Sequence, residues 1–568
     1  METVKEPQMN FLTGAWRFIY SKTTRTHFIF AAAVAAVPAV TDVLVCWISG
    51  KNVANIGSSF LIRSFLWGFL ASYAGKAWQL FFIFSAAVME LVWLNFIIFF
   101  GSPITSGDMM NIFRESADVF DLTYLRHVWF VFAVVLTTYG ALAFFAWKAA
   151  AFRRPLSRIQ GGGGMLCLIM ALMPVLHAHQ GEPLNHFCSS VTKASLYNAG
   201  LTFSYFFGKY LPDGITPSEI QYLPYSVHRT APKSKNILLV FGESLASDHF
   251  PMFGYNRQTF PDLSKRMERE KTWRTAQGMS GGIGTVTSTL WFFNGVREPA
   301  NVAEFKRKTM TLFKLAKEAG YNTYYLSAQE GRLTTFIGTN WIDTMATKET
   351  EMLLFSRYKD EGLVKLMRNI DFSKGKNFVV VHMRSPHMPY EERYAGREAE
   401  FEKFKPTVNA SNRYEYSINA YDNALLFADH TLNKIISVFD KRTNTADSTV
   451  YITSDHGQLH NYLGKYWGHN NMILEQAKVP FFVRTLRDLT LPPTVSHYEI
   501  AKIIADDLGY VLDNPNEENG TFFLHGNNTD FSYPFIKYKI GKDGSVSKCF
   551  EENTADIKNA DELKKCSP

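Results

Sequence analysis

Hydrophobic and polar residues are arranged differently in the two parts of this 568-residue chain. The first third contains long apolar runs with few charges, whereas from Asn236 onward short apolar runs alternate with segments of helical periodicity. Because a helix needs ~20 apolar residues to cross the hydrocarbon core of a bilayer, the long runs predict membrane spans. We expect five spans, at Thr26–Ile48, Ser58–Gly75, Ala77–Phe100, Val128–Trp147 and Gly164–His179.

The charges between these spans predict their orientation. Basic residues gather before the first span and in alternate loops: Lys5, Arg17, Lys22, Arg25, Lys76, Lys148, Arg153, Arg154 and Arg158. The positive-inside rule therefore predicts a cytoplasmic N-terminus, and five crossings put the rest of the chain on the other side, which is the periplasm for a bacterial inner membrane. The predicted organisation is a transmembrane domain over residues 1–180, a periplasmic linker with interfacial helices over 181–235, and a periplasmic soluble domain over 236–568.

Three ionisable residues, Asp42, Arg63 and Glu90, fall inside predicted spans. Charged groups are costly in lipid and usually face a partner within the bundle. Since Asp42 and Arg63 lie at a similar depth, we expect them to form an ion pair between the first two spans, with Glu90 linked to the same network.

The soluble part has the alternating pattern of an α/β protein. Short apolar runs predict strands at Asn236–Phe241, Asn322–Ser327, Asn377–His382, Thr449–Thr453 and Val479–Val483. Apolar residues recurring every three or four positions predict helices at Thr309–Ala319, Arg413–Lys441 and Tyr498–Leu508. Strands that alternate with helices predict a largely parallel sheet with helices on both faces.

Polar residues follow directly after two of these strands. The run Asn236–Phe241 leads into Gly242 and Glu243, and Thr449–Thr453 leads into Ser454, Asp455 and His456. A glycine-rich turn with several hydroxyls, SGGIGTVT from Ser280 to Thr287, lies between them in the chain. Because ligands of open α/β sheets bind at the carboxyl ends of the strands, these residues are candidates for the functional site.

Glu243, Asp455 and His456 together offer a ligand set suited to zinc. Zinc accepts carboxylate and imidazole ligands, and a catalytic site keeps a further position for water, substrate or a nucleophile. A threonine hydroxyl from the glycine-rich turn, placed at that position, loses its proton more easily than a free alcohol. A single Asp-His pair at a strand end is more often a turn device, so the prediction rests on the combination of the three residues with the turn.

Composition removes several other classes of function. The net charge of +7 is modest for this length, and no interleaved basic and aromatic motif points to nucleic acid. The five cysteines contain no CxxC pair, which disfavours a thiolate zinc site. Cys549 and Cys566 flank a polar C-terminal tail and pair only if that tail lies outside the cytoplasm, a question that the sequence leaves open.

Several ordered motifs resemble the bacterial phosphoethanolamine transferases. They are the segments Gly242–Lys265, Ile283–Thr287, His382–Tyr390, Asn419–Leu426 and Thr453–Gln458. That family includes the enzymes that modify lipid A and the mobile colistin-resistance transferases. The resemblance implies a fold of two parts, an N-terminal five-helix transmembrane bundle and a periplasmic α/β/α domain of the alkaline phosphatase and sulfatase type.

Residue by residue, the resemblance implies specific roles. Glu243, Asp455 and His456 match the family's zinc ligands, and Thr287 matches its nucleophile, which also binds the metal, with Thr285 as a neighbour in the substrate site. The substrate-contacting or second-metal histidines match His387 and His469, which makes both of them catalytic candidates. The candidates for substrate binding are His382 beside the site, Asn111 in an outer loop, and Glu115, which stands where the family has a threonine.

Two positions depart from the family pattern. Ile283 and Phe293 stand where a disulfide often braces the nucleophile turn, and the sequence around His469 reads WGHNN. The absence of that disulfide is compatible with a branch outside the lipid A enzymes, and the departure around His469 concerns the alignment of this histidine.

The resemblance also implies a reaction. Phosphoethanolamine would pass from phosphatidylethanolamine to a threonine of the enzyme, and then to lipopolysaccharide, at lipid A or a core sugar, or to another envelope glycan. Three alternatives stay open at this point: a phosphodiesterase or other hydrolase of the same superfamily, a transferase of a different head group, and a non-catalytic scaffold for envelope assembly.

Overall fold

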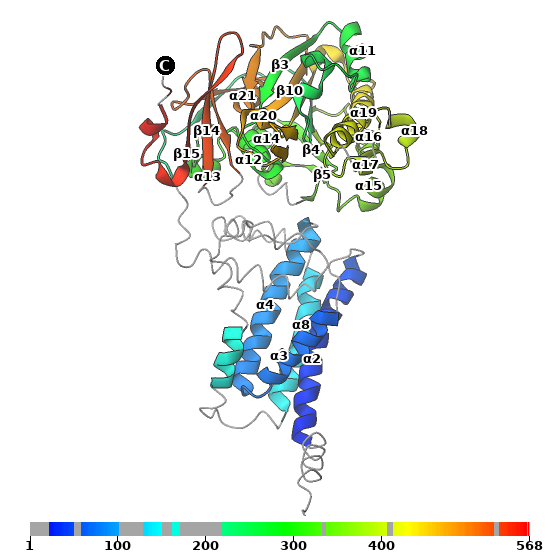
Figure 1. Cartoon of the computed structure of the whole chain (residues 1–568), viewed down its shortest axis with the longest axis vertical. Helices are drawn as coiled ribbons and strands as arrows, with labels where there is room; N and C mark the ends of the chain where they lie inside the picture. The colour runs from blue at the N-terminus through cyan, green and yellow to red at the C-terminus, as the bar shows by residue number, and fades with distance from the viewer. Residues whose placement is uncertain are drawn as a thin grey trace, which may run out of the picture. The chain divides into compact units, whose positions relative to one another are not determined.

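The computed structural model describes residues 22–49, 58–100, 129–149, 162–170, 219–331, 337–405, 413–526 and 533–564, together with Cys566. The chain divides into two compact units, Met1–Ile215 and Thr216–Pro568. Both units are drawn in Figure 1.

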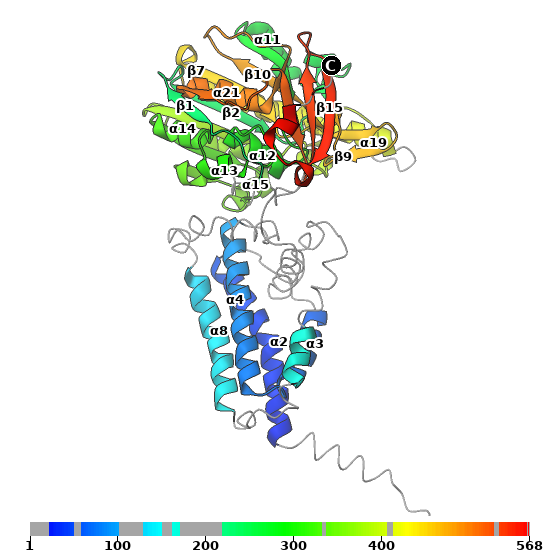
Figure 2. The same ribbon diagram turned by 90° about the vertical axis from the view of Figure 1, so that its left-hand side faces the viewer.

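The first unit is helical. Its main helices are α2 (Lys22–Ser49), α3 (Ser58–Ala71), α4 (Lys76–Phe100) and α8 (Trp129–Lys148), which Figure 2 shows from a second side. Three segments are long and apolar enough to cross a membrane: Arg25–Ser49, Lys76–Asn95 and Trp129–Lys148. The second predicted span corresponds to α3, which has only 14 residues, and the fifth is described only as the helical segment 162–170. Three of the five predicted spans thus have crossing length in the described residues.

Large apolar side chains cover the outside of the helical unit, and several polar ones lie inside it. Trp47, Phe84 and Trp129 are 80%, 69% and 71% exposed, whereas Asp42 and Glu90 are buried. The Tyr139 hydroxyl of α8 donates a hydrogen bond to Glu90. Arg63 is exposed on α3 and, within the described residues, forms no ion pair with either acid. The predicted Asp42–Arg63 pair is therefore wrong, because Arg63 lies on the exposed side of α3 whereas Asp42 is buried.

The second unit is built around an eight-stranded mixed sheet. Its strands lie in the order β11-β3-β10-β7-β2-β6-β4-β5. Their bounds are β2 (Asn236–Gly242), β3 (Trp273–Met279), β4 (Tyr321–Ser327), β5 (Thr344–Ala346), β6 (Lys376–His382), β7 (Ser448–Ser454), β10 (Lys478–Arg484) and β11 (Thr494–Ser496). All five predicted strands are confirmed. The sheet is largely parallel, as predicted, and β10 is the one strand in it that runs antiparallel to both of its neighbours.

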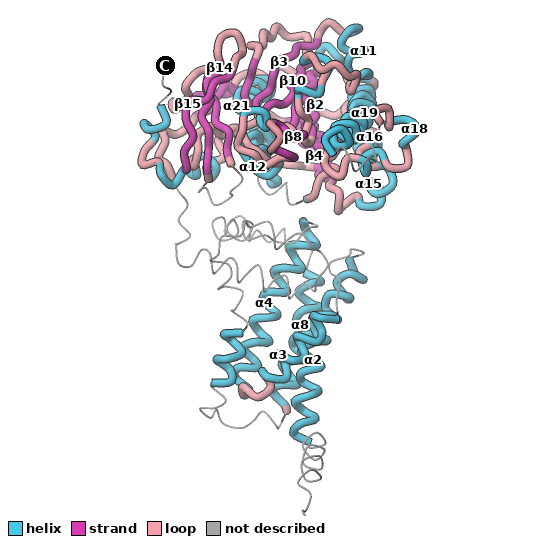
Figure 3. Tube along the Cα trace, in the orientation of Figure 1, coloured by secondary structure: helices cyan, strands magenta, loops and turns pink. Residues whose placement is uncertain are grey.

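Helices cover both faces of this sheet, as the tube drawing in Figure 3 shows. Their bounds are α11 (Pro261–Arg269), α12 (Thr285–Asn294), α13 (Val302–Arg307), α14 (Leu312–Glu318), α15 (Met352–Tyr358), α16 (Glu361–Met367), α17 (Glu391–Tyr394), α18 (Glu398–Phe401), α19 (Arg413–Asp440), α20 (Leu474–Ala477) and α21 (His497–Leu508). The three predicted helices are present as α14, α19 and α21.

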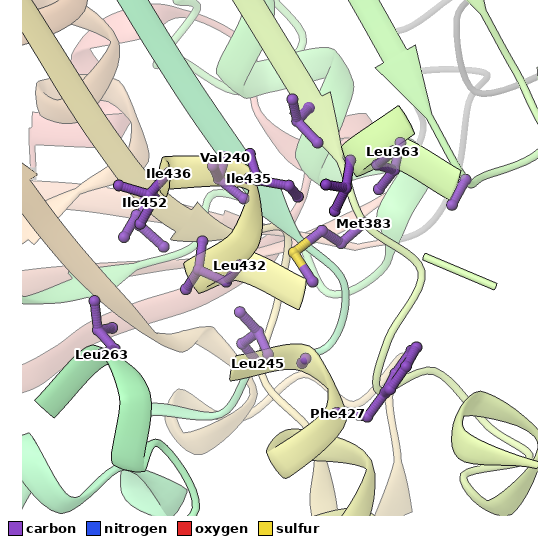
Figure 4. Close-up of a cluster of buried hydrophobic side chains, with 14 of the residues drawn as sticks. Val240, Leu245, Leu263, Leu363, Met383, Phe427, Leu432, Ile435, Ile436 and Ile452 are labelled. Atoms are coloured by element: carbon purple, nitrogen blue, oxygen red, sulfur yellow. The ribbon is translucent and has the colours of Figure 1, made fainter. Parts of the chain in front are cut away.

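Strand β2 explains why a continuous apolar run marks the centre of the sheet. Leu238 and Val240 pack into the core beneath α19, while Ile237, Leu239 and Phe241 pack into the core on the opposite face. Alternate residues of a strand point to opposite faces, so a strand covered on both sides is apolar at every position. Figure 4 shows the first of these cores, where Val240 and Ile452 meet Leu432, Ile435 and Ile436 of α19.

Smaller sheets complete the unit. They are formed by β1 (Ser226–Arg229) with β12 (Tyr510–Asp513), by β8 (Leu459–Tyr462) with β9 (Tyr466–Gly468), and by β13 (Thr521–His525), β14 (Pro534–Ile540) and β15 (Val546–Asn553). Cys549 of β15 forms a disulfide with Cys566, which answers the question that the sequence left open.

Candidate metal centre

The pairing of β2 with β7 brings the three predicted ligands together. The two strands are parallel neighbours in a register that sets Gly242 opposite Ser454, so Glu243 and Asp455 follow at the same edge. The ligand atoms of Glu243, Asp455 and His456 lie within 4.8 Å of one another, and all three residues are fully buried. Two carboxylates and an imidazole in so small a buried volume are a candidate site for a metal ion.

One oxygen of Asp455 is saturated with hydrogen bonds and the other is not. Its Oδ1 accepts from the backbone N–H groups of Ser244 at 2.8 Å and His456 at 2.7 Å, and from the Ser454 hydroxyl at 3.2 Å. Its Oδ2 is buried and has no hydrogen-bond donor within the described residues. Burial and the neighbouring Glu243 carboxylate raise the pKa of Asp455. A cation beside Oδ2 would supply the missing partner of this buried oxygen.

The tautomer of His456 is set by its own loop. Its Nδ1 lies 2.9 Å from the carbonyl oxygen of Gly457, which can only accept, so Nδ1 carries the proton. The other nitrogen, Nε2, faces the carboxylates, 3.3 Å from Asp455 Oδ2 and 3.7 Å from Glu243 Oε1, and is the lone-pair nitrogen when the ring is neutral. This is the arrangement in which a histidine offers a lone pair to a metal.

Both oxygens of Glu243 are held by neighbouring side chains. The Ser244 hydroxyl donates to Oε1 at 2.7 Å, and Gln329 Nε2 donates to Oε2 at 2.5 Å and to the Met383 carbonyl at 2.9 Å. Arg384 in turn donates to Gln329 Oε1 at 2.9 Å. Burial alone raises the pKa of Glu243, but His387, His456 and the Ser244 hydrogen bond outweigh it, so the pKa is lowered.

Gln329 was not predicted from the sequence, although a signal was available. It follows the end of β4, a predicted strand, just as Glu243 follows β2 and Asp455 follows β7. The same rule about carboxyl ends of strands would have brought it into the candidate set.

The hydroxyl that the structure brings to this cluster belongs to Thr285. Its Oγ1 lies 3.2 and 3.4 Å from the two oxygens of Glu243 and 3.4 Å from His456 Nε2. Thr285 is the first residue of α12, after Gly284 as N-cap. The N-terminus of a helix favours negative charge, so an anionic ligand at Thr285 gains from the position. The turn before it needs glycine at 282, because a Cβ there would lie 2.7 Å from the backbone nitrogen of Ser288.

Thr287, the predicted nucleophile and metal ligand, takes a different direction. It lies two residues further along α12, which turns it about 200° around the helix axis from Thr285. It is buried, and its Cγ2 methyl lies near the Gly282 turn. The two threonines therefore leave the helix in different directions, and the hydroxyl of Thr285 lies within hydrogen-bond distance of Glu243.

Two further histidines line the same region. The ring of His469 lies 4.8 Å from that of His456, and the ring of His387 lies 5.9 Å from that of His469, measured between centroids. Burial lowers the pKa of His387, and burial together with nearby His456 lowers the pKa of His469 to about 4. The structure therefore gathers both predicted catalytic histidines beside the metal ligands.

His382 and the outer-loop candidates differ in what the structure describes. His382 is fully buried at the end of β6, with Nδ1 2.7 Å from the Tyr325 hydroxyl and its ring against Phe241. Burial lowers its pKa to about 4, which keeps the imidazole neutral. Asn111 and Glu115, predicted to bind substrate, lie outside the described residues.

The residues present fit a divalent cation. Two carboxylates and an imidazole nitrogen, with a hydroxyl at 3.2–3.4 Å, match the donor types and number that zinc takes in catalytic sites. The unpartnered Asp455 Oδ2 and the inward-facing His456 Nε2 are the observations behind this fit.

Comparison with known proteins points to one family. A sulfatase family model matches residues 235–499. Phosphoethanolamine transferase EptC of Escherichia coli K12 is 25% identical over 242 residues, which cover 39% of this chain and 40% of that protein. Kdo(2)-lipid A phosphoethanolamine 7''-transferase of the same strain is 26% identical over 263 residues, 44% of each chain. The chain is thus similar to phosphoethanolamine transferases over about two-fifths of its length, within the region that the sulfatase model matches.

A solved structure of one of these relatives is also similar to this chain. The C-terminal periplasmic domain of EptC from Escherichia coli, in complex with Zn, is 20% identical and covers 54% of this chain and 94% of that one, at a TM-score of 0.46. A similarity at that level supports no argument about the site. The chain spans about two-fifths of the length of the curated relatives that it matches, so its own activity is a matter for proposal.

Proposed function

We propose that this protein is a phosphoethanolamine transferase, which transfers phosphoethanolamine from phosphatidylethanolamine to an acceptor of the bacterial cell envelope through a covalent phosphothreonine at Thr285. The observation that carries the proposal is the Thr285 hydroxyl placed 3.2 Å from Glu243 and 3.4 Å from His456 within the candidate metal centre. The printed activities of the relatives, which are phosphoethanolamine transferases, support the choice of donor group.

The first step forms one bond and breaks one. Thr285 Oγ1 attacks the phosphorus of the donor, the bond from phosphorus to the diacylglycerol oxygen breaks, and that oxygen takes up a proton to leave as diacylglycerol. In the second step an acceptor hydroxyl or phosphate oxygen attacks the phosphothreonine, and Thr285 recovers its proton. We assign His387 and His469 to these proton exchanges, because the ring of His469 lies against that of His456 and the ring of His387 lies 5.9 Å from that of His469.

Zinc is the metal that we propose, held by Glu243, Asp455 and His456 beside Thr285. When bound, it would supply Lewis-acid chemistry, which lowers the pKa of an adjacent hydroxyl and offsets charge on phosphoryl oxygens. The chain's own contribution is to fix its ligands: Asp455 by three donors, His456 by the Gly457 carbonyl, and Glu243 by Ser244 and Gln329.

The acceptor that we propose is lipopolysaccharide, with the catalytic unit in the periplasm and the N-terminus in the cytoplasm. The support is the name of one relative, a Kdo(2)-lipid A transferase, together with three apolar helices of crossing length and the placement of positive charges in the sequence. The proposed boundaries remain 1–180 for the membrane domain, 181–235 for the linker and 236–568 for the catalytic domain.

Intact-mass spectrometry tests the covalent step. Full-length protein incubated with phosphatidylethanolamine should gain the mass of one phosphoethanolamine group. The matched variants are Thr285→Ala and Thr287→Ala. Each removes one threonine hydroxyl, and the two threonines flank Val286 in α12. The adduct should vanish in Thr285→Ala and persist in Thr287→Ala. The reverse result would return the nucleophile to Thr287, and an adduct in neither wild-type nor variants would refute the transferase. Mass spectrometry of lipopolysaccharide from cells with and without Thr285→Ala tests the acceptor.

A further inference from the structure

The catalytic unit contains a second hollow, away from the metal centre. It lies between α16 and the C-terminal half of α19, two helices that run side by side (Figures 1 and 3). Its volume is about 340 Å³, within the range of pockets that hold small ligands. The charged side chains that line it are those of Glu361, Lys365, Arg368, Lys434 and Lys441, together with the polar Tyr358 and Ser437.

The lining of this hollow, named the α16–α19 groove, is strongly cationic. Four of its side chains are basic and one, Glu361, is acidic. Glu361 is already neutralised, because Lys434 lies 2.6 Å and Arg397 lies 2.7 Å from its oxygens. In the part of the chain that the structure describes, Lys365, Arg368 and Lys441 have no carboxylate within ion-pair distance. Three positive charges thus face one hollow without an anionic partner.

The floor of the groove is apolar rather than hydrated. Val364 is buried and Val438 half-buried, and both line the hollow. At the rim, the Lys365 ammonium lies 3.4 Å from the centre of the Tyr358 ring, a cation–π contact that holds the lysine beside the opening. A ligand for this groove therefore needs anionic groups for the rim and a weakly polar body, such as the face of a sugar ring, for the floor.

The groove is separate from the candidate metal centre. Tyr421 of α19 donates to the Ser244 carbonyl beside Glu243, whereas the groove begins at Lys434 on the same helix and reaches Lys441, directly after the helix ends. Ser437, in the middle of the groove, comes sixteen residues after Tyr421, which is about 24 Å along the helix axis at ~1.5 Å per residue. A ligand in the groove is out of reach of Thr285, so this is a binding site rather than a second part of the reaction centre.

We propose that the α16–α19 groove binds a phosphorylated sugar, with Lys365, Arg368 and Lys441 around the phosphate and the sugar ring over Val364 and Val438. Phosphate is favoured over a carboxylate because its two negative charges and three acceptor oxygens suit several converging cations. The charges and the shape of the groove support this binding site by themselves, so the site does not depend on the proposed transferase activity.

Calorimetric titration of the full chain in neutral detergent at low salt tests the site. Glucose 6-phosphate is the probe, glucose reports the contribution of the sugar, and inorganic phosphate reports the contribution of the anion. We expect saturable binding of glucose 6-phosphate, weaker binding of inorganic phosphate and none of glucose. The double variant Lys365→Glu/Lys441→Glu should weaken binding at least about tenfold, because it replaces two charge-assisted contacts by repulsion.

Three controls make the result decisive. Lys558→Glu makes a matched charge change at an exposed lysine outside the groove and should leave binding unchanged. Asp455→Asn disables the candidate metal centre and should also leave it unchanged, which separates this site from the proposed activity. If Lys365→Glu/Lys441→Glu unfolds the protein, the milder Arg368→Gln should still weaken binding.

Two outcomes would overturn the proposal. One is glucose 6-phosphate binding that is equally strong in wild-type and in Lys365→Glu/Lys441→Glu, which would put the ligand elsewhere. The other is a combination of two results: no saturable binding of glucose 6-phosphate, together with binding to phosphatidylglycerol vesicles that is lost in Lys365→Glu/Lys441→Glu. That combination would make the groove a contact for anionic lipid.

Discussion

Both units of this protein bury acidic side chains, but they do so in different ways. In the helical unit, Glu90 is buried and accepts a hydrogen bond from Tyr139 of another helix. In the α/β unit, Glu243 and Asp455 lie within 4.8 Å of His456, and Asp455 Oδ2 lacks a donor in the described residues. A buried acid with a protein donor is a structural device, whereas two buried acids that share a volume with an imidazole nitrogen are a suitable site for a cation.

The difference lies in the backbone as well as in the side chains. Glu90 and Tyr139 sit within helices, where the backbone groups are already paired with one another. Glu243 and Asp455 sit just after strand ends, where backbone N–H groups are free to turn toward a carboxylate, as those of Ser244 and His456 do. Strand ends can therefore hold one oxygen of an acid and leave the other for a ligand.

Neutralising Asp455 should have the largest effect. Asp455→Asn keeps the shape but removes the charge that faces the ion, so transfer activity should fall by about 10³-fold, since a bound metal supplies several kcal/mol of transition-state stabilisation. Glu90→Gln, the same kind of change in the helical unit, should leave the rate per folded molecule within a few fold. Rates in detergent with a fluorescent phosphatidylethanolamine check this. Equal losses of transfer rate in Asp455→Asn and Glu90→Gln would show that the two buried acids do not differ in function.

Metal removal should destabilise only the α/β unit. A ligand present at 100 times its Kd stabilises the folded state by about 2.7 kcal/mol, so chelation should lower the Tm of this unit and added zinc should restore it. Thermal unfolding with and without chelator measures the shift, and Glu243→Gln should abolish it. A Tm that changes neither when chelator is added nor when zinc is restored would contradict a bound cation.

Gln329→Ala should weaken metal binding by about 10- to 100-fold, as expected for a group that orients a metal ligand. The reason is the 2.5 Å hydrogen bond from Gln329 Nε2 to Glu243 Oε2. Competition with a zinc chelator measures the affinity without any activity assay. Asn322→Ala removes an amide whose hydrogen bonds, at 3.0 Å to the Lys374 carbonyl and 3.4 Å to Asn377, lie away from the centre, and should have no effect. An unchanged affinity in Gln329→Ala would reduce this residue to a packing role.

The smallest effect is expected in the helical unit. Tyr139→Phe removes one hydrogen bond to the buried Glu90 carboxylate and should cost about 1.5–3 kcal/mol of stability, the usual contribution of a hydrogen bond to a charged group. Tyr73→Phe, at a tyrosine that is 42% exposed, is the matched control. Unfolding of the helical unit in mixed micelles compares the two. A loss in Tyr73→Phe as large as in Tyr139→Phe would mean that burial of the acid does not set the cost.

How much the sequence predicts depends on whether a property is local. The strand that ends at Gly242 and the helix Arg413–Asp440 were predictable, because a run apolar at every position and an apolar stripe of period 3.6 each have one structural solution. The antiparallel direction of β10 was not, since a short apolar run contains no information about the direction of its neighbours. The C-terminal strands β13 to β15 were likewise missed, and in β15 every residue is at least partly exposed to solvent.

In the candidate site, too, local properties were predictable from the sequence and long-range ones were not. Glu243, Asp455 and His456 were found because each comes just after a strand, and ligands gather at such ends. Which threonine faces them was decided by the rotation of α12, and a shift of two residues reverses the face of a helix. Gln329 and Arg384 entered only through contacts between segments more than 50 residues apart.

By itself, then, the sequence determined the division into an apolar helical part and an α/β part, the strands that carry the ligands, and the chemistry of those ligands. These follow from composition and periodicity, which act over a few residues at a time. Tertiary structure alone decided the hydroxyl at the metal centre, the partner of Glu90 and the cationic groove between α16 and α19. Each of these depends on distances between segments far apart in the chain, and such distances are set only when strand order, helix rotation and packing are fixed together.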